Sequence, residues 1–197
     1  MIVLVLVLLA LAAAAPLLDT PLRRVVADPV LPVAALSVVL LGAAAAFAAD
    51  VGRAHDWRLA TGLVLGVVVA TTAGSHVVRA VFRLMRREFL PARVRTMVPT
   101  TAAGDAEPAE PSEAPVLTDR PETVLRGGAW IGYLERAAVA ATLLAGWPEG
   151  VALVLAVKGV GRYSELRETN APEAFIIGTF ASMLWAVAAA GTVHLLR

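Results

Sequence analysis

The sequence predicts an all-α protein, a polytopic transmembrane helical bundle of about six helices. Hydrophobic residues make up 58% of the 197 residues, and only 17% are charged, against about a quarter in ordinary soluble domains. The mean hydropathy is +0.74, which excludes a water-soluble globule and a disordered chain. The net charge of +1 is the difference between 17 basic and 16 acidic residues, so it gives no sign of a nucleic-acid partner.

Four uncharged stretches are long enough to cross a bilayer, which takes about 20 apolar residues per helix. They are residues 1–18, 29–49, 59–78 and 174–196. The small-residue run 12–15 resembles a signal-peptide cleavage region, but no basic residue precedes the apolar run. We therefore expect an uncleaved first helix.

A fifth apolar region, 127–163, contains the turn sequence Gly-Trp-Pro-Glu-Gly at 146–150. Glycine and proline interrupt helices, so the sequence predicts a helical hairpin of residues 127–145 and 148–163. One continuous helix over 137–157 is the alternative. It would place Lys158 and Arg162 on the outer side of the membrane, which fits the distribution of basic residues less well.

Basic residues set the expected orientation. Arg79, Arg83, Arg86, Arg87, Arg93 and Arg95 follow the third apolar stretch, and basic loops face the cytoplasm. With six helices, both termini are then outside. The composition, rich in Ala, Val and Arg, resembles that of GC-rich bacteria, so we expect the plasma membrane of a bacterium.

A polar linker divides the chain. Residues 97–126 are rich in proline and acidic residues, and such composition cannot bury enough apolar surface to fold. We expect a disordered cytoplasmic spacer between an N-terminal membrane half of three helices, 1–96, and a C-terminal half, 127–197. Docking of this acidic linker on the arginines after the third helix is the alternative to a solvated spacer.

Small residues recur at four-residue spacing on two helices. Gly62, Gly66 and Gly74 share one face of the third stretch, and Gly178 and Ser182 share one face of the last. Such faces let membrane helices approach closely. They predict contact within the chain or between copies, and a polar path beside Ser182 is the alternative.

Charged residues within helical segments are the candidate functional cluster, because charges are costly in hydrocarbon and often functional there. They are Glu135, Arg136, Lys158 and Arg162. Glu135 precedes the hairpin turn by about as many residues as Lys158 follows it, so the two lie at similar depth. We expect Glu135 to pair with Lys158 or Arg162. Separate snorkelling of these side chains to the headgroups is the alternative.

No established catalytic or cofactor motif is found. The sequence has no Cys and lacks HExxH, GxSxG and P-loop patterns. His76 and His194 are expected on opposite sides of the membrane, so they cannot share a metal. We therefore expect no metal, no cofactor and no catalytic residue.

The C-terminal half resembles a bacterial multi-pass membrane protein family of unknown function. The resemblance rests on Trp-Ile-Gly-Tyr-Leu-Glu-Arg at 130–136, on Lys158 with Arg162, and on Phe-Ile-Ile-Gly-Thr at 175–179 with Ser182. Val-Lys-Gly at 157–159 stands where that family usually has Ala-Lys-Ser. The resemblance covers about 127–185 and implies membership without a mechanism.

Two function hypotheses follow. The first is a non-catalytic membrane protein that assembles with a second copy or with another membrane protein in the lipid bilayer. The second is a transporter or channel for a small solute or ion, which uses the charges of the C-terminal half. An intramembrane enzyme is a third hypothesis. A cavity between helices that contains Glu135 and Lys158 would favour transport.

Overall fold

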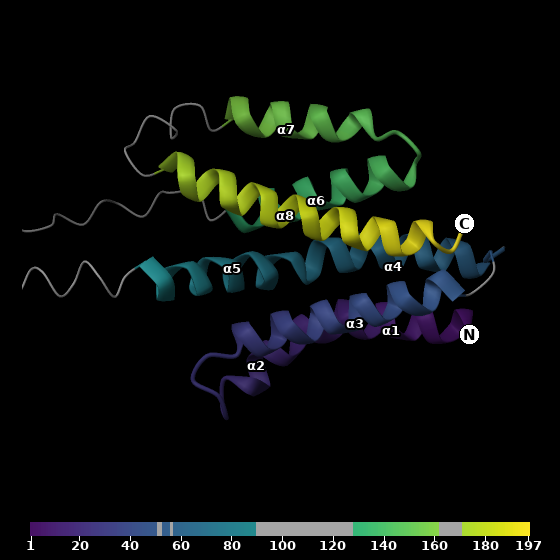
Figure 1. Ribbon diagram of the computed structural model, residues 1–197, viewed down its shortest axis with the longest axis horizontal. Helices are drawn as coiled ribbons and strands as arrows, with labels where there is room; N and C mark the ends of the chain where they lie inside the picture. Colours follow the sequence, from purple (N-terminus) through teal and green to yellow (C-terminus); the bar gives the residue numbers. More distant parts are fainter. Residues whose placement is uncertain (51–52, 56, 90–127, 162–170) are drawn as a thin grey trace, which may run out of the picture.

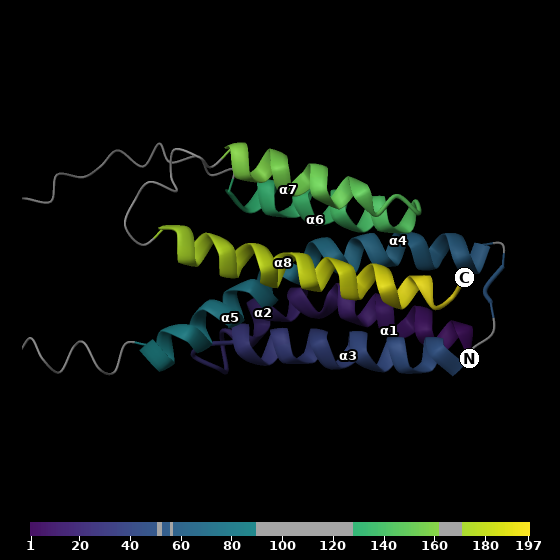
Figure 2. The same cartoon turned by 45° about the horizontal axis from the view of Figure 1, so that its top comes forward.

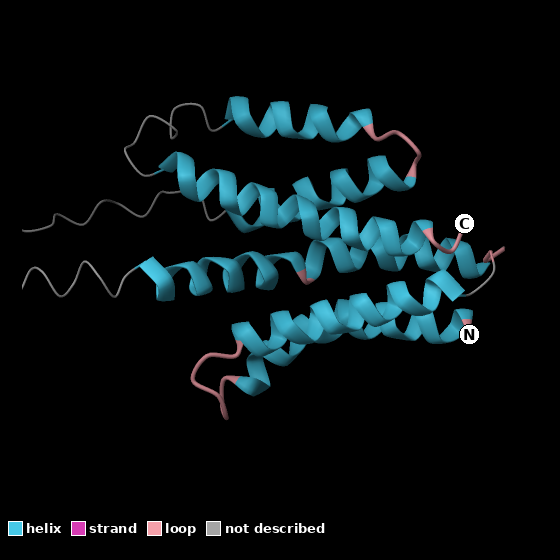
Figure 3. Ribbon diagram, in the orientation of Figure 1, coloured by secondary structure: helices cyan, strands magenta, loops and turns pink. Residues whose placement is uncertain are grey.

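The computed structural model describes residues 1–50, 53–55, 57–89, 128–161 and 171–197, and these form helices joined by short turns (Figures 1 and 3). In chain order the helices are α1 (Ile2–Ala14), η1 (Ala15–Leu18), α2 (Asp19–Leu22), α3 (Val30–Asp50), α4 (Trp57–Thr72), α5 (Gly74–Phe89), α6 (Gly128–Leu144), α7 (Glu149–Gly161) and α8 (Ala171–His194). The segments α1, η1 and α2 run on from one another, and so do α4 and α5 (Figure 1). The predicted all-α bundle of about six helices is confirmed.

Four helical stretches are long and apolar enough to cross a membrane: Ile2–Leu22, Val30–Asp50, Trp57–Met85 and Phe175–His194. The hairpin helices α6 and α7 are shorter, with 17 and 13 residues. Their turn lies where the sequence predicts it, with Gly146 at φ 75°, a backbone conformation that favours glycine. The sequence thus located the hairpin, but its two helices fall short of the four long spans.

The two membrane halves pack into one bundle. A single buried core contains Leu9 of α1, Val69 of α4, Val139 of α6 and Val193 of α8. Both termini lie at one end of this bundle, and α5 ends at the opposite end, where α6 and α8 begin (Figures 1 and 2). We call this second end the α5–α6 end. The linker 97–126 lies outside the described residues.

The third span is broken at Ala73, between α4 and α5. The hydroxyls of Thr71 and Thr72 bond back to carbonyls one turn earlier, and Ser75 donates to the Thr72 carbonyl at 3.1 Å. Back-bonded hydroxyls beside a glycine bend helices. The rod turns at this point, so that α5 runs in a different direction from α4 (Figure 2).

The third helical span extends beyond the end that the sequence predicts for it. The third helix was expected to end at residue 78, with the arginine cluster following it as a loop. Instead α5 continues to Phe89 and contains Arg79, Arg83, Arg86 and Arg87. Arg83 pairs with Asp28, just before α3. Helix continues through these residues because the arginines are good helix formers and polar positions can lie beyond the hydrocarbon.

Small residues allow α4 to approach α8 closely. A methyl group added at Gly66 would lie 2.6 Å from Val193 Cγ2, and one at Gly62 would lie 3.4 Å from Leu196 Cδ1. Both glycines are buried. The stripe on α4 therefore serves contact within this chain.

We predict that Gly66→Ala lowers stability by about 1–3 kcal/mol, because an extra methyl group overpacks the α4–α8 contact. Gly42 of α3 is the matched control, since an added methyl group there meets no atom within 4 Å. Gly42→Ala should leave stability unchanged or raise it slightly. Thermal unfolding of the purified variants in detergent measures both effects, and equal stabilities would contradict the packing argument.

Candidate functional site

A pocket of about 540 Å³ lies between α5, α6 and α8, with one residue from α7, and both charged and apolar side chains line it. Ligand pockets in proteins commonly enclose about 300–1,000 Å³. The pocket is on the α5–α6 side of the break at Ala73. Its lining residues are Ser75, Val78, Arg79, Phe82, Ala129, Gly132, Tyr133, Glu135, Arg136, Lys158, Phe175, Gly178, Thr179 and Ser182.

Arg136 of α6 is the most deeply buried charged side chain of the pocket, with 5% of its surface exposed. Its Nε donates to the Thr71 carbonyl at 3.3 Å, and one terminal nitrogen donates to Ser182 Oγ at 3.4 Å. The guanidinium carbon lies 5.3 Å from the centre of the Tyr133 ring. Among the described residues no carboxylate pairs with Arg136, although an arginine offers five N–H donors.

Two glycines make room for this side chain. A methyl group added at Gly74 would collide with Arg136 Cδ and would come within 2.9 Å of Trp185 Cδ1. One added at Gly132 would lie 3.3 Å from a terminal nitrogen of Arg136. The slot for the arginine is therefore built from the start of α5 and from the preceding turn of α6. Gly74, for which the sequence predicts a role in helix packing, lies against side chains of α6 and α8 and borders the candidate site.

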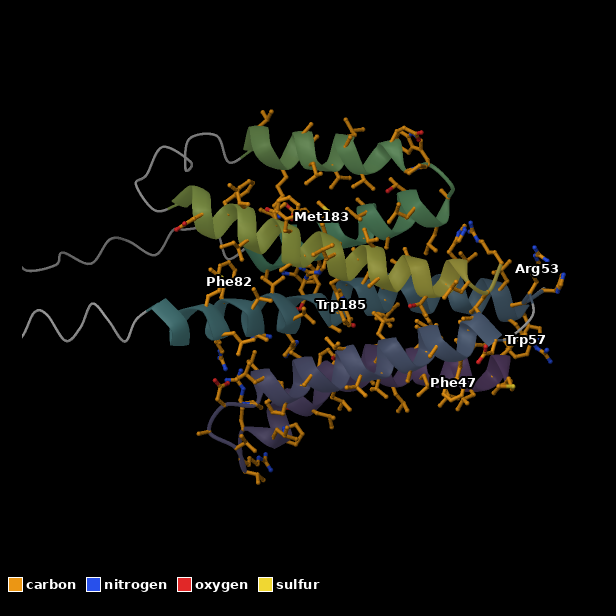
Figure 4. The ribbon with its side chains drawn as sticks, in the orientation of Figure 1. Phe47, Arg53, Trp57, Phe82, Met183 and Trp185 are labelled. Carbon is orange, nitrogen blue, oxygen red and sulfur yellow. The ribbon has the colours of Figure 1, made fainter. Side chains whose placement is uncertain are left out.

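Trp185 of α8, labelled in Figure 4, also borders the slot, because a methyl group added at Gly74 would meet its ring. Its indole nitrogen donates to the Val69 carbonyl at 3.0 Å, and only 5% of the residue is exposed. This bond ties α8 to the last turns of α4. Trp185 and Arg136 thus both donate to backbone carbonyls beside the break, where a polar backbone group inside a membrane needs a partner.

Glu135 and Lys158 form an ion pair across the hairpin. Both side chains are 14% exposed, and the ammonium lies 5.9 Å from the centre of the Phe175 ring of α8. The pair therefore lies at the edge of the pocket. The two side chains contact each other and do not extend separately to the headgroups. Arg162, the alternative partner, lies outside the described residues.

The remaining predicted packing residues also lie at contacts within the chain. A methyl group added at Gly178 would lie 3.0 Å from Phe82, which points from α5 toward α8 (Figure 4). Ser182, one turn further along α8, receives the Arg136 hydrogen bond. Gly178 and Ser182 therefore belong to the pocket, whereas Gly62 and Gly66 pack at the far end of α4.

A second polar cluster on α5 was missed by the sequence analysis. Asp19 Oδ2 lies 3.8 Å from His76 Nε2 and accepts from Arg23 at 2.9 Å. His76 Nε2 also lies 3.0 Å from a terminal nitrogen of Arg79. Because Arg79 lines the pocket too, this cluster is the neighbour of the candidate site. Asp19 and His76 each lie within four residues of an arginine, so no sequence signal singled out their contact.

The pocket has an excess of positive charge. Its charged lining is Arg79, Arg136 and Lys158 against Glu135, and Glu135 is already paired with Lys158. Thr179 Oγ1 also lines the pocket, and it is buried without a hydrogen-bond partner among the described residues. Within the same residues no three His, Asp or Glu side chains gather as metal ligands. The site is therefore suited to an anionic group.

Comparisons with models of protein families, with curated proteins and with solved structures give no match for this chain. The likeness of residues 127–185 to a bacterial membrane family therefore stays a prediction.

We predict that Glu135→Gln and Lys158→Gln each lower stability, because each leaves the other charge buried without its partner. The double change should cost less than the sum of the single changes, with a coupling of about 0.5–3 kcal/mol. Thermal unfolding in detergent supplies the values. Glu149→Gln, at the exposed first residue of α7, is the control and should cost no more than about 1 kcal/mol, which is the contribution of an acidic residue to the start of a helix. Additive losses would mean that the two charges act independently.

Proposed function

We propose that this chain is a non-catalytic membrane protein whose role is binding, and that its pocket receives an anionic group. The observation that carries the proposal is the burial of Arg136. Only 5% of its surface is exposed, and it forms no salt bridge with an acidic side chain among the described residues. An unpaired cation is costly inside a membrane. A bound anion would compensate that cost, and a guanidinium is suited to bind oxyanions through two hydrogen bonds at once.

Binding of a ligand has more support than self-assembly through the small-residue faces. Gly62, Gly66 and Gly178 meet side chains of their own chain, so these faces are already occupied. Another membrane protein could still supply the anionic group, as a carboxylate on a neighbouring helix. The proposal therefore concerns the chemistry of the site, and partner binding remains one form of it.

We predict that inorganic phosphate at millimolar concentration raises the unfolding temperature of the protein in detergent, at constant ionic strength adjusted with chloride. Arg136→Met should abolish this rise. Without ligand, Arg136→Met should be as stable as the unchanged protein or more stable, because replacing a buried charge with an apolar side chain of similar length is often neutral or favourable.

The control is Arg53→Met, at an exposed arginine near the opposite end of the bundle, which should keep the phosphate response. Two results would contradict the proposal. One is a phosphate response that survives Arg136→Met. The other is a large loss of ligand-free stability in that variant, which would make Arg136 a structural brace of the break at Ala73.

Transport of a small solute or ion is the second candidate function. The observation that favours it is the helix break at Ala73 beside the pocket, because transporters often bind substrates at interrupted helices. The pocket also contains Glu135 and Lys158, which is the feature expected of a transporter. Transport would further require the opposite end of the bundle to open, and that end is filled by Leu9, Val193 and Leu196.

We also infer that the protein lies in the plasma membrane of a bacterium, as a member of the family that its C-terminal half resembles, with both termini outside. The chain has no Cys, so single cysteines report the orientation. We expect an impermeant thiol reagent on intact cells to label His55→Cys and Glu149→Cys but not Ala109→Cys in the linker. Both His55 and Glu149 are exposed. Labelling of the linker position alone would reverse the orientation.

A further inference from the structure

The volume of the pocket limits the kinds of anion that can fill it. A cavity of about 540 Å³ equals the share of roughly 18 water molecules at about 30 Å³ each. A single inorganic anion would leave most of that space empty. The ligand therefore has a substantial body in addition to its charged group.

The residues that line the pocket indicate whether the body of the ligand is polar or apolar. Polar groups gather at the inner end of the pocket, where Arg136, Ser182 and Thr179 lie on facing helices. The aromatic rings of Phe82 of α5, Phe175 of α8 and Tyr133 of α6 supply apolar surface to the rest of the pocket, and the exposed Arg79 and the Glu135–Lys158 pair also line it. The ligand that matches this division has an anionic head and an apolar body.

The position of the pocket in the bundle gives the ligand a route from the bilayer. Beyond the break, α5 packs on α8 and α3, whereas α6 packs mainly on α4, α7 and α8 and touches α5 at few residues. The pocket lies between α5 and α6, so it is bordered there by two helices with little mutual contact. An apolar chain that leaves the pocket on this side would therefore displace few contacts between helices.

The basic residues lie at a depth that suits a headgroup. Arg79 follows Gly74 by five residues, which places it about 7.5 Å further along α5 at 1.5 Å per residue. Arg79 is exposed, whereas Arg136, beside Gly74, is buried. The pocket thus has one cation at its outer part and one at its inner part, and basic pockets between helices on one side of a membrane are typical sites for phospholipid headgroups.

We propose that the ligand is a lipid that bears a phosphate group, with the phosphate between Arg136 and Arg79 and its acyl chains leaving between α5 and α6. This inference rests on the proposed anion binding and adds the class of ligand. Thr179 supplies a hydroxyl that can donate to a phosphate oxygen. The Glu135–Lys158 pair borders the site and leaves Arg136 as the principal anion-binding group.

The test uses the full chain in detergent and three ligands that separate head from body. Dioctanoyl phosphatidic acid has both parts, glycerol 3-phosphate has only the head, and dioctanoylglycerol has only the body. Binding is measured by native mass spectrometry and by the shift of the unfolding temperature. We expect phosphatidic acid to bind at least 100-fold more tightly than glycerol 3-phosphate, and dioctanoylglycerol to give no saturable binding.

Variants locate the bound lipid. Arg136→Met should weaken the binding of phosphatidic acid at least 10-fold, and the isosteric Thr179→Val should weaken it about 3- to 10-fold. Arg53→Met, at the opposite end, should leave it unchanged. Thr179→Val tests the same site by a second change that leaves the buried arginine in place.

The outcomes distinguish this inference from the function on which it rests. Binding of glycerol 3-phosphate as tight as that of phosphatidic acid, and dependent on Arg136, would overturn the lipid and leave anion binding in place. Binding of phosphatidic acid that ignores both Arg136 and Thr179 would show lipid around the bundle only, and would overturn the inference. Absence of binding by every phosphate ligand would overturn both proposals.

Discussion

The break of the third span at Ala73, between α4 and α5, is the constraint on which the arrangement of the pocket depends, and the Arg136 side chain is inserted beside it. The side chain of α6 reaches the carbonyl of Thr71 on α4 and the hydroxyl of Ser182 on α8. Three helices from both halves of the chain therefore meet at one guanidinium. Because Gly74 and Gly132 offer no side chains at this place, a long cation can occupy what would otherwise be a close helix contact.

The break and the pocket have a common physical origin. Between Ala73 and the end of the bundle that holds both termini, small residues of α4 pack directly against α8, and apolar side chains fill this part of the bundle. On the other side of Ala73, toward the α5–α6 end, α5 takes a new direction (Figure 2), and the aromatic residues Phe82, Phe175 and Tyr133 lie between the helices. A change of direction with larger side chains leaves space that the chain itself does not fill, and polar groups line that space.

The charges around the pocket differ in how well they are satisfied. Glu135 and Lys158 neutralise each other across the hairpin, and Arg83 is neutralised by Asp28. Arg136 has only two hydrogen bonds from the described residues and no salt bridge to any of their carboxylates. An uncompensated charge inside a membrane has a high free-energy cost. The Glu135–Lys158 pair is therefore structural, whereas the guanidinium of Arg136 is available to a ligand.

The sequence by itself determined the bundle and several of its details. Long uncharged stretches can form only helices in a bilayer, and glycine with proline at 146–150 set the hairpin turn. Counting residues from that turn placed Glu135 and Lys158 at the same depth, because helical rise is constant.

What only the tertiary structure decided is which helices lie beside each other. Adjacent positions 135 and 136 point in different directions on α6, so one meets Lys158 and the other meets the break in the opposite half. Likewise, Asp19 and His76 are far apart in the chain, and no nearby residue indicates that their side chains approach each other. Helix formation is dictated by nearby residues, whereas the choice of neighbours depends on the packing of the whole bundle.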